Sequence, residues 1–178
     1  GYYLGDRGFA GKWTHYDESL RVPLIVHDPR LPEAKQGKVV TEMALNSDLA
    51  STMIDLADLP VPQAHTGRSL APLIGGKEVS GWRKDFLCEF LAVPGTIPRW
   101  EGVRGEQMTY ARYFVNGPSE PPYEFLFDLK NDPRQLTNLV DGNREHPFLG
   151  RMRNRCDQLV AMAAVSYTHL RAHETTPH

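Results

Sequence analysis

Lys12 is the residue whose type and setting best suit chemistry on an anion. It follows a glycine-rich, aromatic run from Gly1 to Gly11, which predicts a loop because its four glycines lower helix propensity and allow turns with positive φ. The apolar run from Arg21 to Val26 then predicts a short buried strand, closed by Asp28 and Pro29. A lysine beside a strand end of an α/β sheet can meet an anion and neutralise charge on an ester oxygen as its bond breaks.

A lysine beside a tryptophan is, by itself, usually a surface residue, so a functional role for Lys12 depends on the sequence around it. The stretch Gly-Lys-Trp-Thr-His-Tyr-Asp-Glu-Ser-Leu-Arg-Val-Pro, from Gly11 to Pro23, resembles the sulfatase segment that follows an Asp-Asn or Asp-His pair holding the active-site calcium. The resemblance implies that Lys12 contacts the substrate sulfate. His15 lies three residues further on and could reach the same pocket. The resemblance also implies that the chain is a C-terminal fragment whose metal ligands precede Gly1.

Two later stretches also resemble sulfatases, and the resemblance extends over about residues 1 to 163. Residues 39–75 match the scaffold of the main domain, and residues 98–139 match the C-terminal subdomain. In relatives, loops in the second stretch help to shape the substrate pocket. Arg99 and Arg104 are therefore candidates for binding an anionic sugar or a sulfate, although pairing with Glu101 or Asp128 is the alternative.

The elements predict an α/β fold in which the end of a large sheet domain precedes a small α+β subdomain. A helix that Asn46 and Ser47 cap should carry an apolar stripe with Met53 and Leu56 in the core, and should end before Pro60. Glycine, lysine, glutamate and serine between residues 75 and 81 indicate a linker. We expect residues 1–76 to belong to the catalytic domain and residues 77–165 to form the subdomain.

The subdomain should be an antiparallel sheet covered by one helix. Bulky and polar residues tend to alternate in strands over 85–90, 102–115 with a turn near Gly105, and 123–129. Apolar residues then follow helical spacing from Phe148 to Ala164, and the basic run 151–155 is expected on a solvated face. The tail 166–178 resembles translated sequencing-adaptor read-through, and we expect it to be non-native.

The composition of the chain limits the classes of partner that it is expected to bind. The net charge is −2 and the pI about 6.4, so nothing favours nucleic acid or an anionic membrane. No apolar run approaches the length that spans a bilayer. Cys88 and Cys156 have no metal-ligand spacing, which favours two reduced thiols, although a disulfide is possible in an exported protein. Asp128, Asn131 and Asp132 are interpreted as a turn because calcium-loop spacing is absent, so no metal ligand is predicted.

The predicted function is that of a fragment of a sulfatase, which hydrolyses small-molecule or carbohydrate sulfate esters. The resemblance implies calcium and a formylglycine nucleophile, but the Cys-or-Ser-x-Pro-x-Arg motif of that nucleophile does not occur in the chain. The isolated chain should therefore be inactive. A phosphodiesterase or phosphonate monoester hydrolase of the same superfamily and a non-catalytic module that binds sulfated glycans are the alternatives. The resemblance favours a periplasmic or extracellular location and leaves the oligomeric state open.

Overall fold

The computed structural model describes residues 1–91, 97–115, 117 and 119–174, with side chains as far as residue 164. Two compact units divide the chain: Gly1–Pro23 with Asp85–His178, called the sheet unit, and Leu24–Lys84, called the helical unit. The first residues of the chain thus share a unit with the C-terminal sheet. This grouping differs from the expected boundary at residue 76, which followed the order of the sequence and could not anticipate that the start of the chain packs on the sheet.

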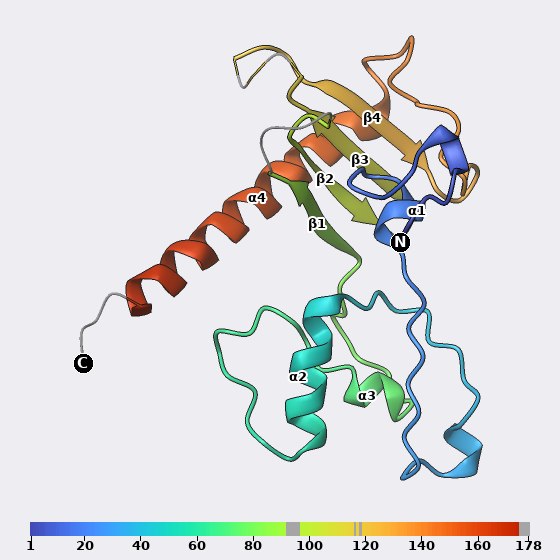
Figure 1. The fold of residues 1–178 in the computed structure, drawn as a ribbon, viewed down its shortest axis with the longest axis vertical. Coiled ribbons are helices and arrows are strands. Elements are labelled where there is room, and N and C mark those ends of the chain that lie inside the picture. The colour runs from blue at the N-terminus through green and yellow to red at the C-terminus, as the bar shows by residue number, and fades with distance from the viewer. Residues whose placement is uncertain (92–96, 116, 118, 175–178) are drawn as a thin grey trace. The chain divides into compact units, whose positions relative to one another are not determined.

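The sheet unit contains four antiparallel strands in the order β1-β2-β3-β4 (Figure 1). They are β1 (Asp85–Phe90), β2 (Trp100–Gly105), β3 (Met108–Tyr113) and β4 (Tyr123–Asp128). Residues 102–115, predicted as a strand pair or as one long strand with a turn near Gly105, belong to the tight hairpin of β2 and β3. The prediction of an antiparallel sheet with one packed helix is confirmed.

A different segment of the chain packs on each face of this sheet. Val103, Tyr110 and Leu126 point to one face, where they pack with Leu149 and Cys156 of helix α4 (Pro147–Glu174). The alternate positions face the other way and pack with the start of the chain, which contains the short helices η1 (Asp6–Gly8) and α1 (Asp17–Leu20); these positions include Trp100, Ala111, Tyr113 and Phe125. The period-2 alternation of the strands thus produces three layers.

Two arginines of the basic run on α4 pair with acids of the sheet, although their side chains stay 41% and 39% exposed. Arg153 forks onto Glu124 of β4, and Arg155 forks onto Asp85 of β1 through contacts of 2.7 Å. Both acids lie on the face of the sheet that α4 covers, so the arginines can reach them from the helix. Helix α4 also extends to Glu174, beyond the predicted end at Ala164. Residues 175–178 of the predicted non-native tail lie outside the described residues, and that prediction is untested.

The helical unit consists of η2 (Glu33–Lys35), α2 (Asn46–Leu56) and α3 (Ala71–Ile74). The helix predicted after Asn46 is confirmed, but its buried face is polar: Asp48, Ser51 and Thr52 are buried, whereas Met53 is 69% exposed. The prediction that Met53 is a core residue is therefore wrong. Side-chain hydrogen bonds of this polar face to the 67–70 segment, rather than an apolar stripe, hold α2 in place.

The strand predicted over residues 21–26 is also wrong, because these residues adopt no regular structure. Ile25 is 91% exposed, and Leu24 and Val26 are nearly half exposed. A buried strand needs neighbouring strands for its backbone groups, and the described part of the chain pairs none with this segment. The apolar pattern is real, but its hydrogen-bonding partners are not among the described residues.

Cys88 and Cys156 are free and buried, as the sequence favoured. They belong to the core clusters on opposite faces of the sheet, which explains why they do not pair. Burial raises the pKa of the Cys88 thiol to about 12 and that of Cys156 to about 11, so both stay protonated. Among the described helices, none combines the length and apolar character needed to cross a bilayer.

Candidate functional site

Lys12 lies on an exposed loop whose backbone is fixed by the residue that follows it. Trp13 has a φ of 103°, a conformation that side-chain-bearing residues rarely adopt. Its N–H donates to Ser19 Oγ at 3.0 Å, and its carbonyl accepts a 2.7 Å hydrogen bond from the Trp100 indole. Both backbone polar groups of a strained residue are therefore held by side chains, one from α1 and one from β2.

This arrangement gives Lys12 a defined starting point on an otherwise irregular loop. Backbone strain of this kind costs about 1–3 kcal/mol and persists only where its surroundings determine it, often at functional sites. The Trp13 ring also packs edge-on against Phe90, with ring centroids 5.6 Å apart. The Lys12 ammonium lies 5.8 Å from the centroid of the Trp13 ring. The loop thus presents a cation above an aromatic surface at one end of the sheet.

Arg99 lies at the same end of the sheet, next to Trp100 in the chain. Its side chain is 49% exposed and lies 3.9 Å from the Glu101 carboxylate. The guanidinium also lies 5.3 Å from the centroid of the Phe114 ring. The weak ion pair leaves Arg99 the more available of the two predicted substrate-binding arginines.

Unlike the exposed Lys12, His15 is buried in the core. It is 2% exposed and packs among the rings of Tyr16, Tyr113, Phe125 and Phe127. Its Nδ1 lies 2.8 Å from the Tyr113 hydroxyl, and its Nε2 has no partner among the described residues. Burial lowers the pKa of His15 to about 3, with a smaller contribution from the Arg7 charge. These contacts favour a packing role for a neutral imidazole.

Arg104 lies toward the other end of β2 and is engaged in a fork. Its Nε and Nη2 each donate to Asp17 at 2.8 Å, and its side chain is only 13% exposed. The sequence offered Glu101 or Asp128 as the partner, but Asp17 of α1 takes that place. Lys12 and Arg99 thus lie near the same end of β2, but Arg99 pairs with Glu101 on the α4 side of the sheet, whereas Lys12 and the buried His15 belong to the layer on the other side. Arg104 is engaged in an ion pair with Asp17.

Sequence reasoning missed the residues that hold this N-terminal layer. Arg7 is nearly buried, forks onto Glu18 and lies 4.1 Å from the centroid of the Tyr16 ring. Its Nη1 also donates to the Gln135 carbonyl at 3.1 Å, and the Gln135 side chain accepts from the Asp17 N–H at 2.8 Å. Gln135 lies more than a hundred positions from both Arg7 and Asp17 in the chain. No local pattern could have connected them.

The described residues were also compared with the ligand sets that hold metal ions. Among the described residues, no group of three or more His, Cys, Asp or Glu side chains could hold an ion. Asp128 and Asp132 instead accept backbone N–H groups of residues 130, 131, 136 and 137, as the predicted turn requires. The residues present therefore do not fit a calcium site by themselves.

A comparison with models of known protein families identifies the family of this chain. The family model described as N-sulphoglucosamine sulphohydrolase, C-terminal, matches residues 5–162. The chain belongs to this sulfatase family. The predicted resemblance and the predicted fold of the C-terminal subdomain are thereby confirmed.

Curated relatives of this sulfatase chain are themselves sulfatases. An N-acetylglucosamine-6-O-sulfatase of Bacteroides thetaiotaomicron is 32% identical over 143 residues, which are 78% of this chain and 25% of the relative. An arylsulfatase of Clostridium perfringens is 32% identical over 145 residues, covering 78% of this chain and 27% of the relative. The chain thus spans about a quarter of the length of these two sulfatases.

Solved structures agree with the sulfatase assignment. A protein determined in complex with its substrate D-glucosamine-2-N,6-O-disulfate has a TM-score of 0.77 and 26% identity, over 95% of this chain and 33% of that one. The phosphonate monoester hydrolase of Agrobacterium radiobacter has a TM-score of 0.73 and 24% identity, over 93% of this chain and 34% of that one. The second likeness shows a shared fold alone, so the fold does not separate sulfatases from phosphonate hydrolases.

Proposed function

We propose that the chain is the C-terminal part of a sulfatase that hydrolyses sulfate monoesters of sugars. The observation that carries the proposal is the family match over residues 5–162. The sugar is supported by two relatives from Bacteroides thetaiotaomicron, an N-acetylglucosamine-6-O-sulfatase and a delta 4,5-hexuronate-2-O-sulfatase. Calcium and the formylglycine nucleophile are proposed for the whole enzyme, and their groups would come from outside this chain.

Lys12 is the residue of this chain that we assign to the reaction. Hydrolysis breaks the bond between sulfur and the ester oxygen, and a water oxygen becomes bonded to sulfur in the free sulfate. The departing sugar oxygen gains negative charge until it takes a proton. A lysine ammonium beside the sulfate or that oxygen lowers the energy of the transition state most where the charge develops. The fixed backbone at Trp13 supports this role, because positioned charges catalyse without further reorganisation.

Arg99 is the second candidate for substrate contact. Arg99 directly precedes Trp100, whose indole holds the Lys12 loop, and its half-exposed guanidinium can offer a bidentate donor to a sulfate or a uronate carboxylate. Substrate contact by His15 and Arg104 stays a prediction. The buried imidazole and the Asp17 fork favour indirect roles for both, in which they support the layer that carries Lys12.

The test begins with the coding sequence directly upstream of Gly1. We expect an in-frame Asp-Asn or Asp-His pair at the junction and a Cys-or-Ser-x-Pro-x-Arg motif earlier in the frame. The whole protein should then release sulfate from glucosamine 6-O-sulfate faster than it cleaves phenylphosphonate monoesters. A start codon or an unrelated domain at the junction, or a preference for the phosphonate, would overturn the proposal. The isolated chain, which lacks the nucleophile motif, should release no sulfate.

A further inference from the structure

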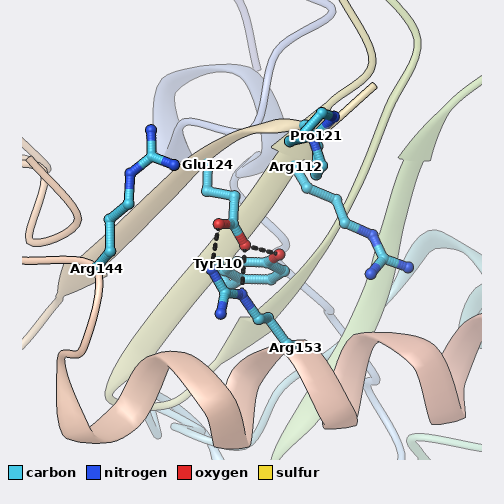
Figure 2. Close-up of a pocket in the computed structure, with 7 residues that line it drawn as sticks. Tyr110, Arg112, Pro121, Glu124, Arg144 and Arg153 are labelled. Atoms are coloured by element: carbon cyan, nitrogen blue, oxygen red, sulfur yellow. Dashed lines mark hydrogen bonds and ion pairs between the residues drawn. The ribbon is translucent and has the colours of Figure 1, made fainter. Parts of the chain in front are cut away.

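A pocket of about 300 Å³ opens on the α4 side of the sheet, whereas the loop with Lys12 belongs to the layer on the other side. Figure 2 shows the carboxylate of Glu124 near its centre, with Arg153 rising from α4 below it. Its lining includes Tyr110, Arg112, Pro121, Glu124, Arg144 and Arg153. Three arginines in one small pocket indicate an anionic ligand.

The acid in this pocket is already matched by its neighbours. Glu124 accepts hydrogen bonds from Arg153 Nε at 2.7 Å and from the Tyr110 hydroxyl at 2.6 Å, and Arg153 Nη2 bonds its second oxygen. Burial raises the pKa of the Glu124 carboxyl, but these donors outweigh that effect and the pKa is lowered overall. Glu124 therefore remains ionised and paired, so its charge does not oppose an incoming anion as a free carboxylate would.

The three arginines differ in how far they are neutralised. Arg112 is bonded to Glu101 at 2.8 Å and to Asp157 at 2.7 Å, so its charge is balanced within the fold. Arg153 is balanced by Glu124. Arg144 is exposed and, within the part of the chain that the structure describes, has no carboxylate within ion-pair distance. In Figure 2, Arg144 and Arg112 flank Glu124 on opposite sides. Arg144 is thus the guanidinium that is open to a ligand.

We propose that this pocket binds one acidic unit of a carbohydrate, with the sulfate or carboxylate of the sugar on Arg144. A guanidinium binds either oxyanion through two parallel hydrogen bonds. The rings of Pro121 and Pro122, neither of which is buried, supply an apolar wall for the C–H face of a sugar, and the volume lies at the small end of the range for ligand pockets. The choice of a carbohydrate rests on the proposed function, whereas the oxyanion rests on the pocket.

The experiment is a calorimetric titration of the 178-residue chain with a heparin-derived tetrasaccharide at low salt. Arg144→Ala should weaken the affinity by about five- to tenfold, the loss of one charge-assisted contact. Arg151→Ala is the matched control, because it removes the same charge from an exposed position of α4 outside the pocket lining. It should change the affinity by less than about twofold, since a surface charge without a direct contact contributes little. Arg144→Lys should retain part of the binding, because the charge is kept and the fork is lost.

Two further titrations fix the ligand class and separate this proposal from the proposed function. Inorganic sulfate should bind much more weakly than the tetrasaccharide, because it lacks the sugar ring; equal affinity, or equal losses in Arg144→Ala and Arg151→Ala, would overturn the proposal. Arg144→Ala should weaken binding by the same factor in a Lys12→Ala background, because Lys12 belongs to the layer on the other side of the sheet. Loss of turnover in Lys12→Ala tests the sulfatase reaction alone, so either proposal can fail without the other.

Discussion

The indole N–H of Trp100 donates a 2.7 Å hydrogen bond to the carbonyl of Trp13, the residue directly after Lys12. Trp100 is 2% exposed in the core of the sheet, whereas Trp13 is 52% exposed on a loop and has a φ of 103°. A rigid element thereby holds a strained backbone position on the loop that carries the proposed sulfate contact. Strain that the fold maintains in this way is common where a side chain must be presented in one orientation.

Replacing Trp100 tests this relationship directly. Trp100→Phe keeps an aromatic ring but removes the donor, so the free energy of unfolding should fall by about 1–2 kcal/mol. Amide hydrogen exchange at residues 12–19 should become faster, because the Trp13 carbonyl loses its anchor.

The control is Trp82→Phe, which also removes an indole donor to a backbone carbonyl, that of Met43 at 2.9 Å in the helical unit. It should leave exchange at residues 12–19 unchanged. Unaltered exchange there in Trp100→Phe would show that the hydrogen bond does not fix the loop.

His15 should make stability depend on pH. Its pKa is lowered to about 3 in the folded chain from an ordinary value of 6.5, so the unfolded chain binds more protons between these values. The stability that the neutral ring contributes is therefore complete above pH 6.5 and is lost as the pH falls toward 3. Between pH 7 and pH 5 the loss should be about 2 kcal/mol.

Urea unfolding of the wild type and His15→Leu at the two pH values measures this term. The difference between pH 7 and pH 5 should shrink in His15→Leu and persist in His27→Ala, because His27 is exposed. An identical pH dependence in wild type and His15→Leu would contradict the buried, neutral imidazole.

In the helical unit, Asp48 and Arg83 form the ion pair on which α2 depends. Asp48 is fully buried, and it accepts Arg83 Nη2 and the N–H groups of Leu45 and Arg68 at 2.7, 2.7 and 2.8 Å. Burial raises the pKa of the Asp48 carboxyl, but these donors outweigh it and the pKa is lowered overall. Stability that depends on the carboxylate should therefore be lost as the pH falls below the ordinary aspartate range.

Asp48→Ala should destabilise the helical unit by about 3 kcal/mol or more, because Arg83 is left largely buried without its partner. Glu78→Ala removes an acid from an exposed position of the same unit and should cost less than about 0.5 kcal/mol. Chemical denaturation followed by circular dichroism compares the two. A loss in Asp48→Ala no larger than in Glu78→Ala would refute the structural role of the pair.

The segment from Leu24 to Val26 should govern the solubility of the isolated chain. Three consecutive exposed apolar residues with strand-forming side chains are a site of association between chains. Ile25→Asp should raise the concentration at which the chain stays monomeric, as measured by light scattering. Leu136→Asp, at a separate apolar position that is 69% exposed, should change it much less. Equal effects would indicate general hydrophobicity rather than this segment.

The sequence predicted the elements that have strong periodicity. The four strands and α4 alternate or repeat as their packing requires, so their places could be read directly from the order of apolar residues. The prediction from periodicity was wrong at α2, where Met53 is exposed and a hydrogen-bonded Asp48 is buried. It was also wrong at Leu24–Val26, which pair with no strand in the part of the chain that the structure describes.

The site was only partly accessible to sequence reasoning, for a physical reason. Lys12 could be identified from its local motif, but the neighbouring Trp13 is held by Trp100, which lies 87 positions after Trp13 in the chain. The fork of Arg104 onto Asp17 spans the same separation. Such pairings depend on how the N-terminal segment packs across the sheet, and no residue near Arg104 in the chain signals its partner.

The measurement that tests the central claim most directly is the steady-state hydrolysis of glucosamine 6-O-sulfate by the whole enzyme with Lys12→Ala. We predict that kcat/KM falls by about 100-fold or more, as when a positioned charge is removed from a developing oxyanion. Lys12→Arg should recover part of the loss, and Arg151→Ala should match the wild type. A Lys12→Ala enzyme that is folded, binds substrate and retains wild-type kcat/KM would contradict the assignment of Lys12 to the sulfate.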